Sequence, residues 1–332
     1  MKSTARVNLA VALIGVLVVC CTTTGTLGPV PSAAATPAPS LETGEPDLTP
    51  APSVTSTPSA APSDAASTDP NAGPPAGPSG TTIVRTYFYL AEGTDADIAP
   101  FLREVPETKA VARAAMTALL GGPTAADRGY PSIGSAIPAG TRLLGLTIAD
   151  RIATVDLSSE FESGSGSASV LTRLGQVVFT LTQFSTVKSV VFQIEGQAVT
   201  VFGSEGVVLD GPVGRARFQE LLPDIYVDRP AYGAALGNPG RVTGSENVWE
   251  ATFRITILDG GGRTIADQSA MGTCDSNCQA QCNNGCRGTF DVTLGYDVPK
   301  AQWGTLRVWA GSAKDGSPVS VREYPVWLTP AR

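Results

Sequence analysis

Four cysteines at a regular spacing are the residues of this chain with the most obvious chemistry. They are Cys274, Cys278, Cys282 and Cys286, each separated from the next by three residues. Four thiolates can bind zinc, but on one helix the outer pair would lie about 18 Å apart and could not share an ion. In an oxidising compartment an even number of cysteines first indicates disulfides. We expect two structural disulfides, nested as Cys274–Cys286 and Cys278–Cys282, that cross-link the two strands of one β-hairpin.

Zinc binding and redox-active thiols are the alternatives for these cysteines, and the sequence permits three different pairings. The intervening Asp275, Asn277 and Asn283 are residue types that favour turns. We therefore expect no bound metal and no cofactor.

A second group with catalytic residue types consists of Asp156, Ser158, Ser159 and Glu160. The chain contains no histidine, so it lacks the commonest general base and the commonest metal ligand. Without a neighbouring base nothing activates either serine, and the end of a strand followed by a Ser-capped turn explains all four residues. The sequence predicts no catalytic residue and a protein that is not an enzyme.

Aromatic residues near the C-terminus are candidates for contact with a glycan or a protein: Tyr226, Tyr232, Trp303 and Trp309. The plainer interpretation is that they fill a core or its rim. The net charge of −7 argues against nucleic acid as a partner, because binding nucleic acid requires clustered Lys and Arg.

The first 21 residues have the layout of an export signal. Lys2 and Arg6 precede an apolar stretch that ends at Cys20 and Cys21, and the stretch is short for a membrane-spanning helix, which needs about 20 apolar residues. It resembles a bacterial lipoprotein signal, and Cys21 (or Cys20) is the expected lipid site. An uncleaved membrane anchor and cleavage near residues 33–35 are the alternatives. All three place the protein outside the cytoplasm, and lipidation places it on the outer face of the cell membrane.

Residues 22–80 are dominated by Pro, Ser, Thr, Ala and Gly. Such a segment cannot bury enough apolar surface to offset its ordering entropy, so we expect a disordered linker. Residues 29–80 of it, as a coil of about 50 residues, would span roughly 40 Å.

Residues 83–210 alternate strand and helix patterns, which predicts an α+β domain. Helices are expected over 107–120 and 167–184, where apolar residues recur at helical spacing, with Ser167 or Ser169 as N-cap of the second. Strands are expected over 83–90, 142–148, 152–157, 188–194 and 198–202.

Residues 222–330 show short strands separated by turn residues, which predicts an all-β immunoglobulin-like sandwich. The clearest strand is 248–257, in which Trp249, Phe253 and Ile255 share one face. Further strands are expected over 225–228, 263–269, 289–294, 305–310 and 319–327. Near residue 222 the helical periodicity ends and short strand patterns begin, and the first domain has no cysteine. We therefore expect the two domains to fold independently.

The first domain resembles the GerM domain, known as the sporulation and spore-germination domain. The resemblance rests on four segments in the family's order: Val111–Pro123, Ile137–Leu143, Ala153–Phe161 and Gln176–Lys188. It implies an exported, often lipid-anchored protein that assembles or localises envelope complexes without catalysis. No catalytic or ligand residue is carried over from the family.

The second domain looks like the immunoglobulin-like domain of bacterial spore germination. The matching features are Pro230, the Val248–Leu258 strand, the Ser312–Ser317 turn and the final Pro325–Val326 strand. We expect an exported envelope interaction or scaffold protein of the sporulation or germination type, whose partners are unidentified envelope proteins and, as a second candidate, peptidoglycan. The alternative is a glycan-binding lipoprotein or one that accompanies a sensor kinase.

Overall fold

The computed structural model describes residues 80–331, apart from 93–94, 126, 128–131, 165, 204–205 and 275–286. The predicted export signal and nearly all of the predicted linker therefore lie outside the described residues. Among the described helices, none is long and apolar enough to span a membrane.

The first domain begins with a long antiparallel hairpin. Strand β1 (Thr81–Glu92) pairs along its whole length with β2 (Asp95–Pro106), and the short β3 (Ile133–Gly134) pairs with the other edge of β1. The predicted strand 83–90 is confirmed as β1. The sequence did not predict β2, because Pro100 and Pro106 interrupt its strand pattern; its place at the edge of the sheet tolerates them.

A second sheet has the strand order β4-β5-β6-β7. Strand β4 (Leu143–Ala149) is antiparallel to β5 (Ile152–Leu157), which is parallel to β6 (Ser189–Ile194). The predicted strand 198–202 is divided: β7 (Gln197–Ala198) pairs with β6, whereas β8 (Val201–Phe202) pairs with β9 (Val207–Val208).

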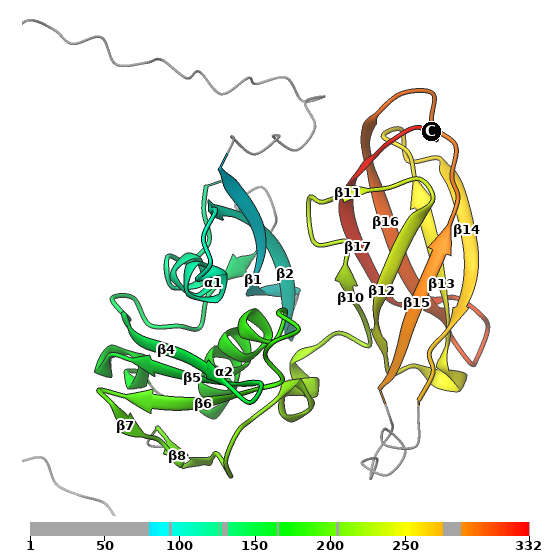
Figure 1. Ribbon diagram of the computed structural model, residues 1–332. Helices are drawn as coiled ribbons and strands as arrows, with labels where there is room; N and C mark the ends of the chain where they lie inside the picture. Colours follow the sequence, from blue (N-terminus) through cyan, green and yellow to red (C-terminus); the bar gives the residue numbers. More distant parts are fainter. Residues whose placement is uncertain are drawn as a thin grey trace, which may run out of the picture. The chain divides into compact units, whose positions relative to one another are not determined.

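Two α-helices complete this α+β domain. Helix α1 spans Val111–Leu120 and α2 spans Ser167–Leu181, so both are shorter than predicted. Figure 1 shows α2 between the two sheets, and every residue from 172 to 181 is buried because β1, α1 and the 3₁₀ segment η3 (Arg215–Leu221) surround it. The N-cap of α2 is Gly166, not the predicted Ser167 or Ser169, and it makes no side-chain cap hydrogen bond.

The second domain is a two-sheet sandwich, as predicted (Figure 1). One sheet has the order β10-β12-β15 and the other the order β11-β17-β16-β13-β14. The strands are β10 (Ile225–Arg229), β11 (Ala235–Leu236), β12 (Gly240–Glu246), β13 (Thr252–Leu258), β14 (Thr264–Met271), β15 (Gly288–Leu294), β16 (Gln302–Gly311) and β17 (Pro318–Leu328). Strands β11 and β12 were not predicted, because Gly240 and Gly244 weaken the strand pattern of β12.

The prediction for the start of β13 was wrong. Trp249 lies in the 3₁₀ turn η4 (Trp249–Ala251), where Glu250 and Ala251 have positive φ angles of 56° and 53°. These left-handed residues break the two-residue alternation of a strand. Trp249 is therefore 75% exposed instead of sharing the buried face of Phe253 and Ile255.

The hydrophobic core does not stop at the predicted domain boundary near residue 222. One cluster of buried residues contains side chains from both domains. Phe101 of β2 stacks on Tyr232 with ring centroids 5.1 Å apart, and Tyr232 contacts Tyr324 of β17 at 4.7 Å. The Tyr232 N–H also donates to the carbonyl of Pro100 over 3.1 Å. The two domains therefore share buried contacts, which the expectation of independently folding domains did not include.

Candidate functional site at the domain junction

A partly buried cluster of charged and phenolic side chains lies where the two domains meet, with Asp228 at its centre. Asp228 belongs to β10, the first strand of the second domain, and its carboxylate receives four side-chain donors. Arg85 Nη1 and the Tyr87 hydroxyl, both from β1, donate over 2.8 Å. The Tyr226 hydroxyl donates over 3.0 Å and Arg215 Nη1 over 3.1 Å. The donors thus come from the first domain, from η3 and from β10 itself.

The electrostatics of this cluster favour a charged carboxylate and neutral phenols. Burial disfavours ionisation of Asp228, but Arg215, Arg85 and the two tyrosine hydroxyls outweigh burial and lower its pKa. Burial raises the pKa of Tyr87 and of Tyr226, and the adjacent Asp228 carboxylate raises both further. Neither phenol is therefore prepared to act as a base at neutral pH.

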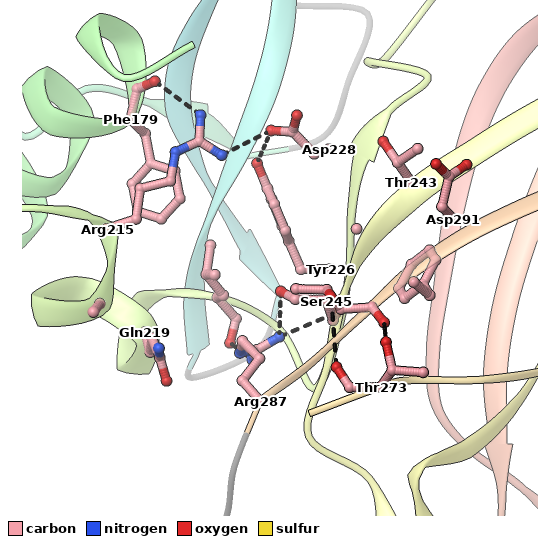
Figure 2. A pocket seen from close by; sticks show the side chains of 15 residues that line it. Phe179, Arg215, Gln219, Tyr226, Asp228, Thr243, Ser245, Thr273, Arg287 and Asp291 are labelled. Atoms are coloured by element: carbon pink, nitrogen blue, oxygen red, sulfur yellow. Dashed lines mark hydrogen bonds and ion pairs between the residues drawn. The ribbon is translucent and has the colours of Figure 1, made fainter. Parts of the chain in front are cut away.

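Arg215 is the residue that joins this cluster to α2. Its guanidinium lies over the ring of Phe179 at 4.7 Å and over that of Tyr87 at 5.5 Å. Its Nε donates to Thr182 Oγ1 over 2.8 Å, and Nη2 donates to the carbonyl of Phe179 over 3.3 Å, as Figure 2 shows for the latter. Nη2 also donates to the Tyr87 hydroxyl over 3.2 Å, so that, with the bond to Asp228, Arg215 makes four hydrogen bonds and two ring contacts within the protein.

Arg287 fixes the segment that connects the two domains. Its Nη2 donates to the carbonyls of Pro223 over 2.6 Å and Leu222 over 3.1 Å, and Nη1 donates to the carbonyl of Ser245 over 3.3 Å. Burial lowers the pKa of Arg287, although Asp224 and other acids nearby oppose that effect. Its guanidinium therefore ties the connecting segment to the start of β15.

A cavity of about 500 Å³ opens between these two arginines (Figure 2). Besides the charged groups described, its wall contains Gln219, Thr243, Ser245, Thr273 and Thr289. The wall offers neither a nucleophile with a base nor a metal site: within the described ranges no group of three His, Cys, Asp or Glu residues could hold a metal ion. Since Asp228, Arg215 and Arg287 bind protein groups, the arrangement is suited to holding the domains together.

In comparisons with known proteins, each of the two domains that meet at this junction matches a protein family. Residues 85–200 match the family described as "Sporulation and spore germination" (Germane), and residues 224–317 match the "Immunoglobulin-like domain of bacterial spore germination" (Gmad2). The chain carries a GerM domain followed by an immunoglobulin-like domain of bacterial spore germination. Both resemblances seen in the sequence are confirmed. No curated protein matches the chain at a significant level.

Solved structures include similar chains at low sequence identity. The first GerMN domain of the Bacillus subtilis sporulation protein GerM is 21% identical, with a TM-score of 0.34 over 41% of this chain and 99% of that one. A putative lipoprotein from Clostridium perfringens is 22% identical, with a TM-score of 0.29 over 41% and 89%. The tandem GerMN domains of GerM are 15% identical, with a TM-score of 0.35 over 65% and 61%.

The predicted cysteine sites lie mostly outside the described residues. Cys20, Cys21, Cys278, Cys282 and Cys286 are not described, so the lipid site and the nested disulfides stay predictions.

Cys274 follows β14, and the segment it begins leads to β15. These strands belong to different sheets of the immunoglobulin-like domain and are joined by an antiparallel bridge between Thr273 and Thr289. The described residues on either side of the segment are thus paired, with Thr273 and Thr289 exchanging two backbone hydrogen bonds of 2.8 and 2.9 Å, and the disulfide-linked hairpin stays a prediction.

The group of Asp156, Ser158, Ser159 and Glu160 forms the end of a strand and a turn, as predicted, but the N-cap residue Ser158 makes no side-chain cap hydrogen bond. Asp156 Oδ1 accepts from the Gly196 N–H over 2.9 Å, and buried Ser158 Oγ accepts from the Arg142 N–H over 2.9 Å. A hydrogen bond from Ser158 is the main cause that lowers the pKa of Glu160. These side chains stabilise the end of β5 and the 3₁₀ turn Ser159–Glu162.

The four candidate contact aromatics separate into two pairs. Tyr226 and Tyr232 are buried at the domain junction, with 3% and 8% exposure, so they are not surface contacts. Trp303 and Trp309 are half-buried on β16 of the immunoglobulin-like domain.

The sequence singled out Tyr226 as a candidate contact residue, but not Asp228, Arg85, Tyr87 or Arg215 or the cluster that they form. Two signals were present: Arg85 lies within a strand rich in apolar and aromatic residues, and Asp228 lies near the end of the short strand that opens the second domain. Arg215 gave no signal, because it lies between the two domain patterns in a segment with neither helical nor strand periodicity.

Proposed function

We propose that this protein is an exported, non-enzymatic interaction or scaffold protein of the cell envelope, working in the assembly or localisation of sporulation- or germination-type complexes. Both of its domain types are non-catalytic families associated with sporulation and germination. The absence of histidine from the whole sequence is consistent with a role in binding.

The observation that carries the proposal is the buried Asp228 cluster. Its two arginines, two tyrosines and one carboxylate connect the GerM domain, η3 and the immunoglobulin-like domain through direct hydrogen bonds. Two domains joined in this way behave as one body, so surfaces on both keep a fixed relation to each other. A fixed relation between surfaces is what a scaffold needs in order to position its partners.

Exposed apolar side chains offer contact points on this body. Trp249 is 75% exposed and Met271 63% exposed, and they lie at the same end of the β13–β14 pair, where Thr252 is the register partner of Met271. Trp and Met are enriched in protein interfaces. Two left-handed residues, Glu250 and Ala251, hold the turn of Trp249 in a costly conformation. The turn is therefore the best place to detect a protein partner.

Photo-crosslinking in the native envelope tests the interaction role. A photoreactive amino acid at position 249 should yield discrete crosslinked envelope proteins, whereas the same residue at Lys314, on the exposed β16–β17 turn, should not. Failure to obtain a discrete product from position 249, and from the exposed positions Val201 and Ile148 of the GerM domain, would contradict the proposal.

Lipid anchoring at Cys21, or at Cys20, is the proposed means of retention on the outer face of the membrane. Its support is the apolar stretch that ends at two cysteines. Changing both cysteines to serine should move the protein from the detergent phase to the aqueous phase in detergent-phase partitioning. Unchanged partitioning of the double variant would indicate an uncleaved apolar anchor instead.

A further inference from the structure

The outer face of the five-stranded sheet of the immunoglobulin-like domain gathers three of the four tryptophans of the chain. They are Trp303 and Trp309 on β16 and Trp327 on β17, and all three are half-buried. Along β16, and along β17 from Tyr324 onward, residues alternate between the buried core and this outer face. The fourth tryptophan, Trp249, lies in the turn before β13 and not on these two strands.

The three indoles form a row along the strands. Trp303 and Trp327 are cross-strand partners whose rings meet edge to face, with centroids 5.3 Å apart at 71°. Trp309 lies six residues further along β16, which corresponds to about 20 Å at 3.3 Å per residue. The row is therefore long enough for several consecutive sugar rings.

Ion pairs lie between the indoles on the same face. Arg307 and Glu323 are cross-strand partners joined over 2.6 Å. Arg254 lies over the ring of Trp309 at 5.8 Å and pairs with Asp267 over 2.5 Å. Each arginine has an acidic partner, so these four charges cancel.

We propose that this sheet face binds a neutral polysaccharide, with pyranose rings stacked on the indoles and sugar hydroxyls bound by the ion pairs. A pyranose ring presents apolar C–H faces and a polar rim of hydroxyls, which matches indoles separated by paired arginines and carboxylates. Trp309 Nε1 already donates to Thr256 Oγ1 over 3.3 Å, which fixes the ring plane in advance of binding. The proposal goes beyond the scaffold function and depends on neither the anchor nor the partner proteins.

Two observations favour a glycan over other ligands at this face. The cancelled charges, on a protein with a net charge of −7, offer no attraction for a phosphate polymer. The most exposed aromatic and sulfur-containing side chains, Trp249 and Met271, lie outside the row of indoles. On the row itself the apolar area is interrupted by ion pairs, unlike the apolar centre of a protein interface.

Tryptophan fluorescence tests the proposal directly. In a full chain carrying Trp249→Phe, the emission arises from the three indoles of this face. Titration with chitohexaose and with cellohexaose should give a saturable change for at least one of them. Trp309→Ala should weaken that binding by about tenfold or more, because it removes the aromatic contact at one end of the row. The absence of a saturable change with either probe well above about 1 mM would overturn the proposal.

Glu323→Gln provides a second variant that keeps side-chain shape and removes one charge of the Arg307 pair. Glycan affinity should fall several-fold while the thermal unfolding midpoint stays close to that of the parent. Equal affinity for the parent, Trp309→Ala and Glu323→Gln would show that the sugar binds elsewhere and would overturn the assignment. Photo-crosslinking of a discrete protein from position 305, with no glycan binding, would assign the face to a protein partner instead.

Discussion

The carboxylate of Asp228 accepts hydrogen bonds from two arginines and two tyrosines while its side chain is only 19% exposed. Replacing one member of such a cluster leaves the remaining charged groups desolvated and without compensation. Asp228→Ala should therefore lower the free energy of unfolding by about 3–5 kcal/mol, as measured by urea denaturation.

Asp291→Ala is the matched control for this change. Asp291 pairs with Arg241 over 2.5 Å, but the two side chains are 54% and 69% exposed. Water replaces an exposed partner at little cost, so this variant should unfold close to the parent. Equal losses in the two variants would mean that the junction cluster contributes no more than a surface ion pair.

The buried carboxyl of Glu246 should give the protein an opposite pH dependence from that of Asp228. Burial is the main cause that raises the pKa of Glu246, although the Val248 N–H donates to it over 2.9 Å. An acid with a raised folded-state pKa contributes stability below its ordinary pKa, and that contribution is lost as the pH rises through the folded value. Asp228, whose pKa is lowered, contributes stability above its ordinary pKa and loses it at lower pH.

Glu246→Gln isolates this effect, because the amide cannot ionise. The stability of the variant relative to the parent should increase when the pH is raised from about 4 to about 7. Denaturation curves at both pH values measure the difference, with Glu162→Gln, an exposed glutamate, as the charge control. A stability difference that is constant with pH, or that falls, would contradict the role given to the buried carboxyl.

At the scale of single residues, the sequence identified turns better than contacts. The turn that follows Asp156 was predicted correctly because local backbone hydrogen bonds form it, from Phe161 to Ser158 and from Ser163 to Glu160. The junction cluster could not be found, because Arg85 and Asp228 are 143 residues apart and no local pattern connects them. The position of Trp249 was predicted wrongly because Glu250 and Ala251 adopt left-handed backbone angles, which cannot be predicted from these residue types.

Among the elements, β12 is the central strand of the three-stranded sheet and depends on Gly244. Gly244 is the register partner of both Val227 and Phe290. A Cβ at this position would overlap the carbonyl oxygen of Tyr226 and lie 2.6 Å from the Phe290 ring. Gly244→Ala should therefore separate β10 from β12 and cost about 3 kcal/mol or more in urea denaturation.

Gly295→Ala is the control for the glycine prediction. A Cβ at Gly295, just after β15, would meet no heavy atom within 4 Å. The change should stay within about 0.5 kcal/mol of the parent. If both alanine variants unfolded like the parent, the described β10-β12-β15 packing would be wrong.

Elements with strong periodicity were predicted well, and weakly patterned ones were not. Strand β5 alternates buried and half-buried residues and was predicted with its observed bounds. Helix α2 was recognised from one apolar face, but its polar side is buried too, where Gln176 donates to the Tyr87 carbonyl over 2.9 Å. When the polar face of a helix is buried and its side chains are hydrogen-bonded, the sequence pattern is the same as that of a helix whose polar face is in water.

At the scale of the whole molecule, the two sequence patterns are correct, but they do not reveal the contacts between the two domains. The change near residue 222, from mixed helix and strand patterns to strand patterns alone, corresponds to a change from α+β to all-β structure. Sequence patterns report local structure, whereas the contacts of Phe101 with Tyr232 and of Arg85 with Asp228 join residues more than 100 positions apart. Coupling between domains is therefore not visible in the local pattern.

Tryptophans and α-helices occur in different domains, so two spectroscopic signals can follow the unfolding of the two domains in one sample. All four tryptophans lie between residues 249 and 327, in the immunoglobulin-like domain, and both described α-helices lie in the GerM domain. Tryptophan fluorescence therefore reports the unfolding of the second domain, and far-ultraviolet circular dichroism reports largely the helices of the first.

Urea denaturation of the full chain, followed by these two signals, tests most directly whether the domains form one unit. The shared core and the Asp228 cluster predict that the fluorescence and circular dichroism curves coincide in the parent protein, and that Asp228→Ala separates them. Two distinct midpoints in the parent protein would show that the domains unfold independently and would contradict the account of the junction.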